Sequence, residues 1–261
     1  MASSRPRSAP RPGFRVAAEP AYVLHRYDWS ESSLILDLFT RAHGRVAVVA
    51  KGAKRPYSQL RAVLLPFQRV SASFSSREEG GAEVHTLKAA EWAGGTAMLT
   101  GAALLTGFYL NELLMKLLAR ADAHPRLFDA YAATLPGLAA DDETVVQAAL
   151  RAFELTLLRE IGVLPELGLV TLTVEPLQPG AAYALHGEAG VRLARAGEPA
   201  LRGATLMALD AALDSGSLEA MQQACAASLP ELKSVLRPLL HYHLGTPVLR
   251  TRQLMMELQQ K

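Results

Sequence analysis

Residues 44–61 read GRVAVVAKGAKRPYSQLR, and they combine a strand pattern with a basic turn. Val46, Val48 and Ala50 alternate with their neighbours as in a half-buried β-strand. The pattern ends at residues 51–56 (KGAKRP), a turn that carries three cations. Cations on a turn at the end of a strand can reach a polyanion without being buried, which suits contacts with phosphates. The alternative is a solvated surface loop, because basic loops are common.

The residues on both sides of this turn carry the pattern of an all-β domain. Alternating runs indicate five strands, at 21–27, 33–40, 45–51, 63–74 and 82–89, of which the fourth is broken near Pro66. Five short strands within about 70 residues fit a closed barrel of the OB type. Such barrels bind single-stranded nucleic acid through a basic groove and stacked aromatic rings. Trp29 and Tyr57 lie in predicted loops, whereas Phe67 is expected in the core.

From residue 98 onward, apolar residues recur at helical spacing. We predict a long helix over 98–118 and further helices at about 127–135, 141–161, 205–214, 217–227, 231–243 and 247–259. Asp141, Asp142 and Glu143 lie at the start of the third helix, where capping and the helix dipole favour negative charge. We therefore interpret these carboxylates as structural. Pro and Gly residues interrupt the helical pattern over 167–193 and indicate a hairpin.

The predicted fold class is α+β, with an N-terminal five-stranded OB-type β-barrel followed by a mostly α-helical domain that has a small hairpin excursion without zinc. The expected boundaries are 1–18 for a disordered basic tail, 19–90 for the nucleic-acid-binding barrel, and 91–261 for the helical domain, with the hairpin at about 166–195. An alternative role for the tail is a supplementary DNA-binding arm.

Charge is unevenly distributed along the chain. Residues 1–80 hold 13 Lys and Arg against 6 Asp and Glu, residues 81–232 hold 9 against 18, and residues 233–261 hold 5 against 1. The net charges are +7, −9 and +4, although the whole chain carries only +2. A basic front and a basic end point to a polyanionic partner.

Several classes of protein are excluded by what the sequence lacks. Cys225 is the only cysteine, which rules out an internal disulfide and a cysteine-rich zinc site, and we expect it to be a buried small residue. No apolar run approaches the roughly 18 residues that span a bilayer, and the N-terminus has no hydrophobic signal segment, so we expect a cytoplasmic protein. Phosphate-loop, dinucleotide-binding, metalloprotease and hydrolase motifs are missing, so we predict no enzyme activity and no cofactor.

Several short motifs resemble those of the RecO family of bacterial recombination mediators, in the family's order, over roughly residues 18–258. The N-terminal ones are YVLH (22–25), ESSL (31–34), LFT (38–40), HGRV (43–46), AKGA (50–53) and LPF (65–67). The later ones are YLNELL (109–114), LF (127–128), RAFEL (151–155), LL (157–158), IG (161–162) and HLG (243–245). Many family members also carry four cysteines that form a zinc ribbon, but residues 163–195 contain none, so we expect no metal there.

The resemblance implies a non-enzymatic role in DNA repair. A protein of this family is expected to bind single- and double-stranded DNA, to anneal complementary strands, and to help load recombinase onto DNA coated by single-stranded DNA-binding protein. The implied partners are RecR and the acidic C-terminal tail of single-stranded DNA-binding protein. The implied location is the bacterial cytoplasm, at the nucleoid.

The candidate DNA contacts are basic residues of the predicted barrel, which would neutralise phosphates and release counterions. They are Arg26, Arg45, Lys51, Lys54, Arg55, Arg61 and Arg69. For the acidic tail we expect an apolar groove edged by cations on the helical domain, with the candidates Arg151, Arg120 and Arg126. The alternative for Arg151 is an ion pair with Glu154, three residues later on the same helix.

Two other functions stay open at this point. An RNA-binding OB module would carry the same basic turn but would bind RNA at least as well as DNA. A protein-docking adaptor would bind nucleic acid too weakly to survive physiological salt.

Overall fold

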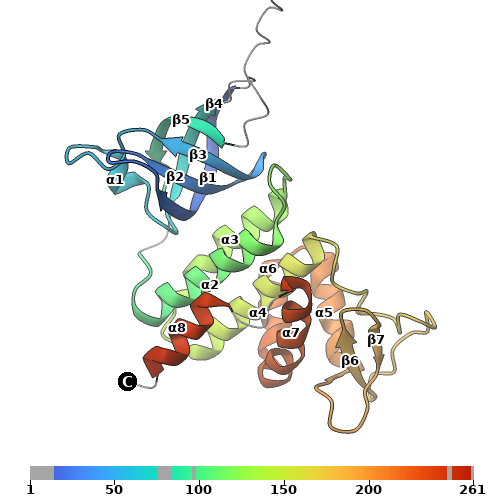
Figure 1. Cartoon of the computed structure of the whole chain (residues 1–261). Helices are drawn as coiled ribbons and strands as arrows, with labels where there is room; N and C mark the ends of the chain where they lie inside the picture. Colours follow the sequence, from blue (N-terminus) through green and yellow to red (C-terminus); the bar gives the residue numbers. More distant parts are fainter. Residues whose placement is uncertain (1–14, 76–83, 96–97, 246–248, 260–261) are drawn as a thin grey trace, which may run out of the picture. The chain divides into compact units, whose positions relative to one another are not determined.

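The chain divides into two compact units in the computed structural model, which describes residues 15–75, 84–95, 98–245 and 249–259. The first unit comprises Met1–Gly95 and Arg120–Ala123, and the second comprises Thr96–Ala119 and His124–Lys261. The first is built of strands and the second mainly of helices (Figure 1). The boundary was predicted after residue 90, whereas the main segment of the first unit ends at Gly95.

The first unit is a closed five-stranded barrel. Its elements are β1 (Arg15–Asp28), β2 (Leu34–Thr40), β3 (Gly44–Ala50), the one-turn helix α1 (Leu60–Val63), β4 (Arg69–Ser75) and β5 (Val84–Trp92). The strands pair in the order β1-β2-β3-β5-β4, and β1 also pairs with β4, which closes the sheet. The pairing of β3 with β5 is parallel, whereas the other pairs are antiparallel. This confirms the predicted OB-type fold.

The length of β1 makes the closure possible. Its first half pairs with β4 and its second half with β2, and the register shifts within each of these two pairings. Such irregularities bend a strand and increase its twist, so one strand can belong to both sides of a barrel. Alternate residues then point inward, and the core includes Val23, Leu36, Leu38, Val46, Val48, Val70 and Phe74.

Two local predictions in this unit are wrong. Residues 63–68 are not part of a strand, because Val63 ends α1 and β4 begins at Arg69. Pro66 has no amide hydrogen and Phe67 has a φ of 66°, so neither residue suits a strand ladder. The predicted disordered tail reached residue 18, but Arg15–Ala18 belong to β1. The rest of that tail, up to residue 14, lies outside the described residues.

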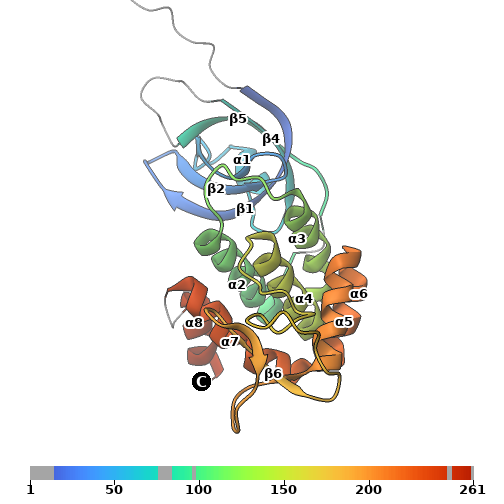
Figure 2. The same ribbon diagram turned by 90° about the vertical axis from the view of Figure 1, so that its right-hand side faces the viewer.

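The second unit is built around a central helix. Its helices are α2 (Gly101–Leu117), α3 (Pro125–Leu138), α4 (Glu143–Glu160), α5 (Gly203–Ser215), α6 (Leu218–Ala226), α7 (Leu229–Leu244) and α8 (Arg250–Gln259). Helix α4 contacts α3, α6 and α7 and runs through the middle of the helical unit in both ribbon views (Figure 1, Figure 2). The side chain of Asp142 accepts a hydrogen bond from the amide of Thr144 at 2.8 Å, so the acidic cluster caps α4 as predicted.

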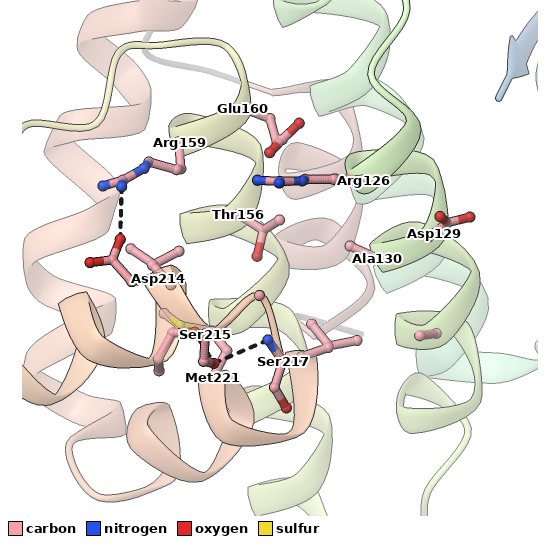
Figure 3. Close-up of a pocket in the computed structure, with 15 residues that line it drawn as sticks. Arg126, Asp129, Ala130, Thr156, Arg159, Glu160, Asp214, Ser215, Ser217 and Met221 are labelled. Atoms are coloured by element: carbon pink, nitrogen blue, oxygen red, sulfur yellow. Dashed lines mark hydrogen bonds and ion pairs between the residues drawn. The ribbon is translucent and has the colours of Figure 1, made fainter. Parts of the chain in front are cut away.

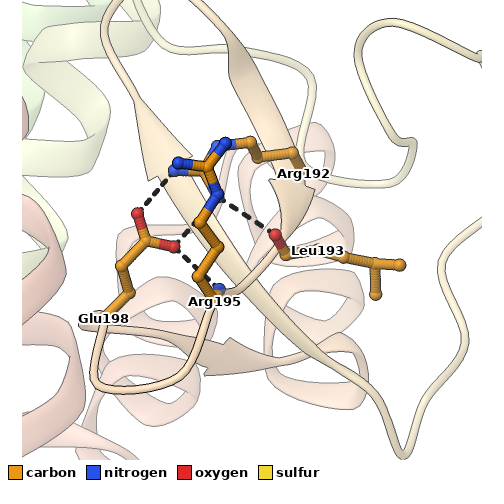
Figure 4. A network of polar contacts seen from close by, with 4 residues as sticks. All are labelled: Arg192, Leu193, Arg195 and Glu198. Carbon is orange, nitrogen blue, oxygen red and sulfur yellow. Dashed lines mark hydrogen bonds and ion pairs between the residues drawn. The ribbon is translucent and has the colours of Figure 1, made fainter.

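The predicted hairpin is formed by β6 (Ala182–His186) and β7 (Gly190–Leu193), and a third strand that was not predicted, β8 (Leu201–Arg202), extends it to a sheet of order β7-β6-β8. The Glu198 carboxylate holds the loop that follows β7 (Figure 4). The guanidinium of Arg192 donates to both oxygens of Glu198, at 2.9 and 2.5 Å, and the amide of Arg195 donates to the same carboxylate at 2.8 Å. These bonds lower the pKa of Glu198 to about 2. The sheet is thus held by side-chain bonds and packing.

A buried ion pair lies on α4. The Arg151 guanidinium is 2.6 Å from the Glu154 carboxylate, and the Glu154 side chain is fully buried. The Tyr109 hydroxyl, on α2, donates to the other Glu154 oxygen at 2.7 Å. Burial raises the pKa of Glu154, while Arg151 opposes that rise. The alternative interpretation of Arg151, a pair with Glu154, is the one found in the structure.

Breaking this pair is expected to destabilise the helical unit strongly. Arg151→Ala leaves a buried carboxylate without its cation, which costs about 3–5 kcal/mol. The triple variant Arg151→Met/Glu154→Leu/Tyr109→Phe removes the charges and the hydroxyl together, so it should lose much less stability. The measurement is the free energy of unfolding in urea. A loss of less than about 1 kcal/mol for Arg151→Ala would contradict the burial of this pair.

Candidate nucleic-acid interface

The basic turn, residues 51–61, is anchored at its base in the barrel core. Ala53 is buried with the core residues, and Gly52 has a φ of 72°, a conformation that suits glycine. The amide of Arg55 donates to the Gly52 carbonyl at 3.1 Å, and the amide of Ser58 donates to the Arg55 carbonyl at 3.0 Å. Successive turns thus lead from β3 into α1, so the cations stand on a defined backbone.

Lys54 connects this turn to the loop between β1 and β2. Its amide donates to the Ser32 carbonyl at 3.0 Å. Its ammonium group donates to the Ser30 carbonyl at 3.0 Å and lies 3.1 Å from the Asp28 carboxylate. Lys54 therefore has a structural role that the sequence did not predict, and Asp28 partly neutralises its charge.

Two aromatic side chains project from the two loops that Lys54 joins. Trp29, in the loop after β1, is 66% exposed, and Tyr57, in the basic turn, is 98% exposed. Both rings are open to solvent, and each has a face on which a nucleic-acid base can stack. Both residues lie in loops, as predicted, whereas Phe67 is buried.

The other predicted cations do not form one group. Lys51, Arg55 and Arg61 are exposed on the basic turn. Arg26, also exposed, donates to the Leu64 carbonyl at 3.4 Å, which places it beside the end of α1. Arg69 lies at the start of β4, where its amide and carbonyl bond to residues 93 and 94 after β5. The structure therefore places Arg26 beside the end of α1, whereas the backbone of Arg69 pairs with the segment after β5.

Arg45 belongs to a second polar cluster on the barrel. Asp37 is almost completely buried, and its carboxylate is 3.4 Å from the guanidinium of Arg120. The amide of Ala121 donates to the Arg45 carbonyl at 3.0 Å. Burial lowers the pKa of Arg45, and the nearby Arg120 adds to this effect, while Asp37 opposes it. Arg120 was expected on the helical domain, but it belongs to the barrel unit, where it compensates a buried carboxylate.

Arg151 lines a pocket of about 360 Å³ in the helical unit, which we call the α7–α8 pocket. It is lined by Thr106, Tyr109, Glu143, Gln147, Leu150, Arg151, Lys233, Arg237, Leu240, His241, Leu249, Arg252 and Met256. Because Arg151 pairs with Glu154, the exposed cations at the edge of this pocket are Lys233 and Arg237, and Arg252 beside them is half-buried. Sequence reasoning missed these three, although the net charge of +4 over residues 233–261 was a signal for them.

Arg126 lines a different pocket, of about 670 Å³, between α3, α4 and the α5–α6 turn (Figure 3). Arg159 in this pocket is paired with Asp214 at 3.0 Å. Glu160 also lines it, so charges of both signs meet there. The structure thus does not bring Arg126 together with Arg151.

The surroundings of Cys225 disfavour a reactive thiolate. Burial raises the pKa of the Cys225 thiol to about 12, and the side chain is completely buried. Within the described ranges, no cluster of three His, Cys, Asp or Glu side chains has the geometry to hold a metal ion. None of the helices described is both long and apolar enough to cross a bilayer.

Comparison with known families covers nearly the whole chain. The family described as "Recombination protein O N terminal" matches residues 15–95, which include the barrel and the basic turn. The family described as "Recombination protein O C terminal" matches residues 98–253, which include the helices and the hairpin sheet.

Curated relatives that share one name match this chain over nearly their full length. "DNA repair protein RecO" of Polaromonas sp. (strain JS666 / ATCC BAA-500) is 56% identical over 247 residues, covering 94% of this chain and 98% of that protein. The proteins of that name from Variovorax paradoxus (strain S110) and Delftia acidovorans (strain DSM 14801 / SPH-1) are 55% and 54% identical, each covering 94% of this chain and 97% of the relative. The chain belongs to the RecO family of DNA repair proteins.

Proposed function

We propose that this chain is a recombination mediator that works by binding and not by catalysis. It binds single- and double-stranded DNA, anneals complementary strands, and helps to load recombinase onto DNA coated by single-stranded DNA-binding protein. RecR and the tail of single-stranded DNA-binding protein are its protein partners, and the bacterial nucleoid is its place of action. The observation that carries the proposal is the joined pair of loops with Trp29, Tyr57 and exposed cations.

The chemistry of these loops fits a single strand. Lys51, Arg55 and Arg61 are solvated, so they can neutralise phosphates at little desolvation cost, and each contact releases counterions. Trp29 and Tyr57 offer ring faces to unstacked bases, and stacking tolerates any sequence. A mediator needs this combination, because it must act on DNA of any sequence. Neutralised phosphates also reduce repulsion between two strands, which favours annealing.

The α7–α8 pocket fits the acidic tail better than the pocket at Arg126. Leu150, Leu240 and Leu249 give it an apolar lining, while Lys233, Arg237 and Arg252 supply positive charge. A peptide with acidic residues, a hydrophobic end and a free carboxylate is complementary to such a surface. The pocket at Arg126 lacks this excess of cations.

The DNA-binding role is tested by the triple variant Lys51→Gln/Arg55→Gln/Arg61→Gln. Each phosphate contact adds about 0.7 to the salt slope for a single strand, so the slope should fall by about 2. The measurement is fluorescence anisotropy of labelled single-stranded DNA in a salt series. The matched control, Lys88→Gln, removes an exposed cation from β5 and should leave the slope unchanged.

The aromatic variants Trp29→Ala and Tyr57→Ala test the same site independently. Each should weaken binding by about 1–3 kcal/mol with little change in the salt slope, because stacking involves no counterions. An unchanged slope in the cation variant, together with unchanged affinity in the aromatic variants, would move the DNA site elsewhere. If the wild-type chain binds RNA as tightly as DNA, an RNA-binding module is favoured. If the wild-type chain binds no nucleic acid at physiological salt, an adaptor is favoured.

Tail binding is tested by Lys233→Glu/Arg237→Glu. These exposed residues line the α7–α8 pocket, so reversing their charges should abolish binding of a labelled acidic peptide with a hydrophobic, free C-terminus. Arg126→Glu, in the other pocket, should have little effect. The measurement is fluorescence polarisation of the peptide with the full chain. The reverse pattern would assign the tail to the pocket at Arg126.

A further inference from the structure

The first turn of α8 is bonded to a carboxylate from α2. The amide of Arg250 donates to one oxygen of Glu112 at 3.0 Å, and the amide of Thr251 donates to the other at 3.0 Å. The Thr251 hydroxyl donates to that second oxygen at 2.7 Å. The first amides of a helix have no acceptor within the helix, and a local side chain usually supplies one. Here the acceptor comes from a residue 138 positions earlier.

Helix α8 contributes two side chains to the α7–α8 pocket, Arg252 and Met256. Arg252 follows Thr251 directly, so its position depends on how the first turn of α8 is held. Leu249, just before the helix, is 2% exposed and lines the same pocket. The Glu112 cap and this buried leucine therefore hold the end of α8 that faces the pocket.

The cations of this pocket oppose the docking of α8. Burial lowers the pKa of Arg252, and the like charge of Arg237 lowers it further. The N-terminal end of α8 adds the positive end of a helix dipole. Glu112 supplies negative charge to that end. Burial would raise the pKa of Glu112, but its bonds to Thr251 and Arg250, together with Lys116, lower it below its usual value. The carboxylate is thus held in the charged form that a cap requires.

We propose that Glu112 is a positioning residue for the acidic peptide in the α7–α8 pocket. Its carboxylate caps α8 and so holds Arg252 and Met256 in place, although Glu112 itself does not line the pocket. Affinity for an anionic peptide then depends on a residue of negative charge. This inference rests on the proposed tail-binding function.

The sign of the effect separates positioning from simple electrostatics. Removing a negative charge near an anion site should strengthen binding if only net charge matters. Glu112→Gln should instead weaken binding of the labelled acidic peptide by about three- to tenfold, the range for loss of a helix cap. The matched control is Glu143→Gln, which removes a carboxylate that lines the pocket and should strengthen binding. Thr251→Val removes one of the three bonds and should cause a smaller loss than Glu112→Gln.

Hydrogen exchange of the full chain reports the cap directly. In Glu112→Gln, amides of residues 250–256 should exchange faster, while those of α4 should be unchanged. Normal peptide affinity in Glu112→Gln, or slow exchange in α8, would overturn the inference and leave tail binding intact. A wild-type chain that does not bind the peptide would overturn the tail-binding function and the inference together. Exchange in α8 would then still show whether the cap exists.

Discussion

The bonds made by Lys54 determine the geometry of the candidate DNA site. Its amide and its ammonium group attach the basic turn to the loop after β1, through Ser32, Ser30 and Asp28. Without these bonds the two loops would be independent, and Trp29 and Tyr57 would have no fixed relation to each other. A preorganised pair of loops binds with a smaller entropy cost than two mobile ones. The closed barrel supplies the rigid base for both.

The cations of the chain divide into structural and available groups. Arg120, Arg151 and Lys54 lie within 4 Å of carboxylates of the chain itself, and two of those carboxylates are buried. The pairs of Arg120 and Arg151 compensate buried carboxylates, so these two cations cannot also neutralise a ligand without leaving a buried charge unpaired. The other cations of the basic turn, and Lys233 and Arg237 of the α7–α8 pocket, are exposed, whereas Arg252 is half-buried and interacts with Glu154. The candidates for partner binding are therefore the cations that stay solvated, and not simply the most basic segments.

Local pattern predicts the elements and the barrel of this chain well, but it predicts contacts between distant side chains poorly. The alternation in β2 and β3 is a local signal, and so are the capping residues of α4. Each of these signals predicted its strand or helix correctly. The fourth strand was placed too early because Pro66 and Phe67 form an irregular segment that its apolar composition conceals. Arg120 was assigned to the wrong unit because only the fold brings it to Asp37. The pocket cations on α7 and α8 were missed for the same reason, since they meet Arg151 from more than 80 positions away.

In the proposed function, DNA lies against the loops joined by Lys54. The most direct measurement is hydrogen exchange of the full chain with and without a single-stranded oligonucleotide at physiological salt. We expect slower exchange at residues 28–33 and 51–61, and no change in the hairpin sheet of β6, β7 and β8. Protection confined to the helical unit, with no change at these two loops, would contradict it.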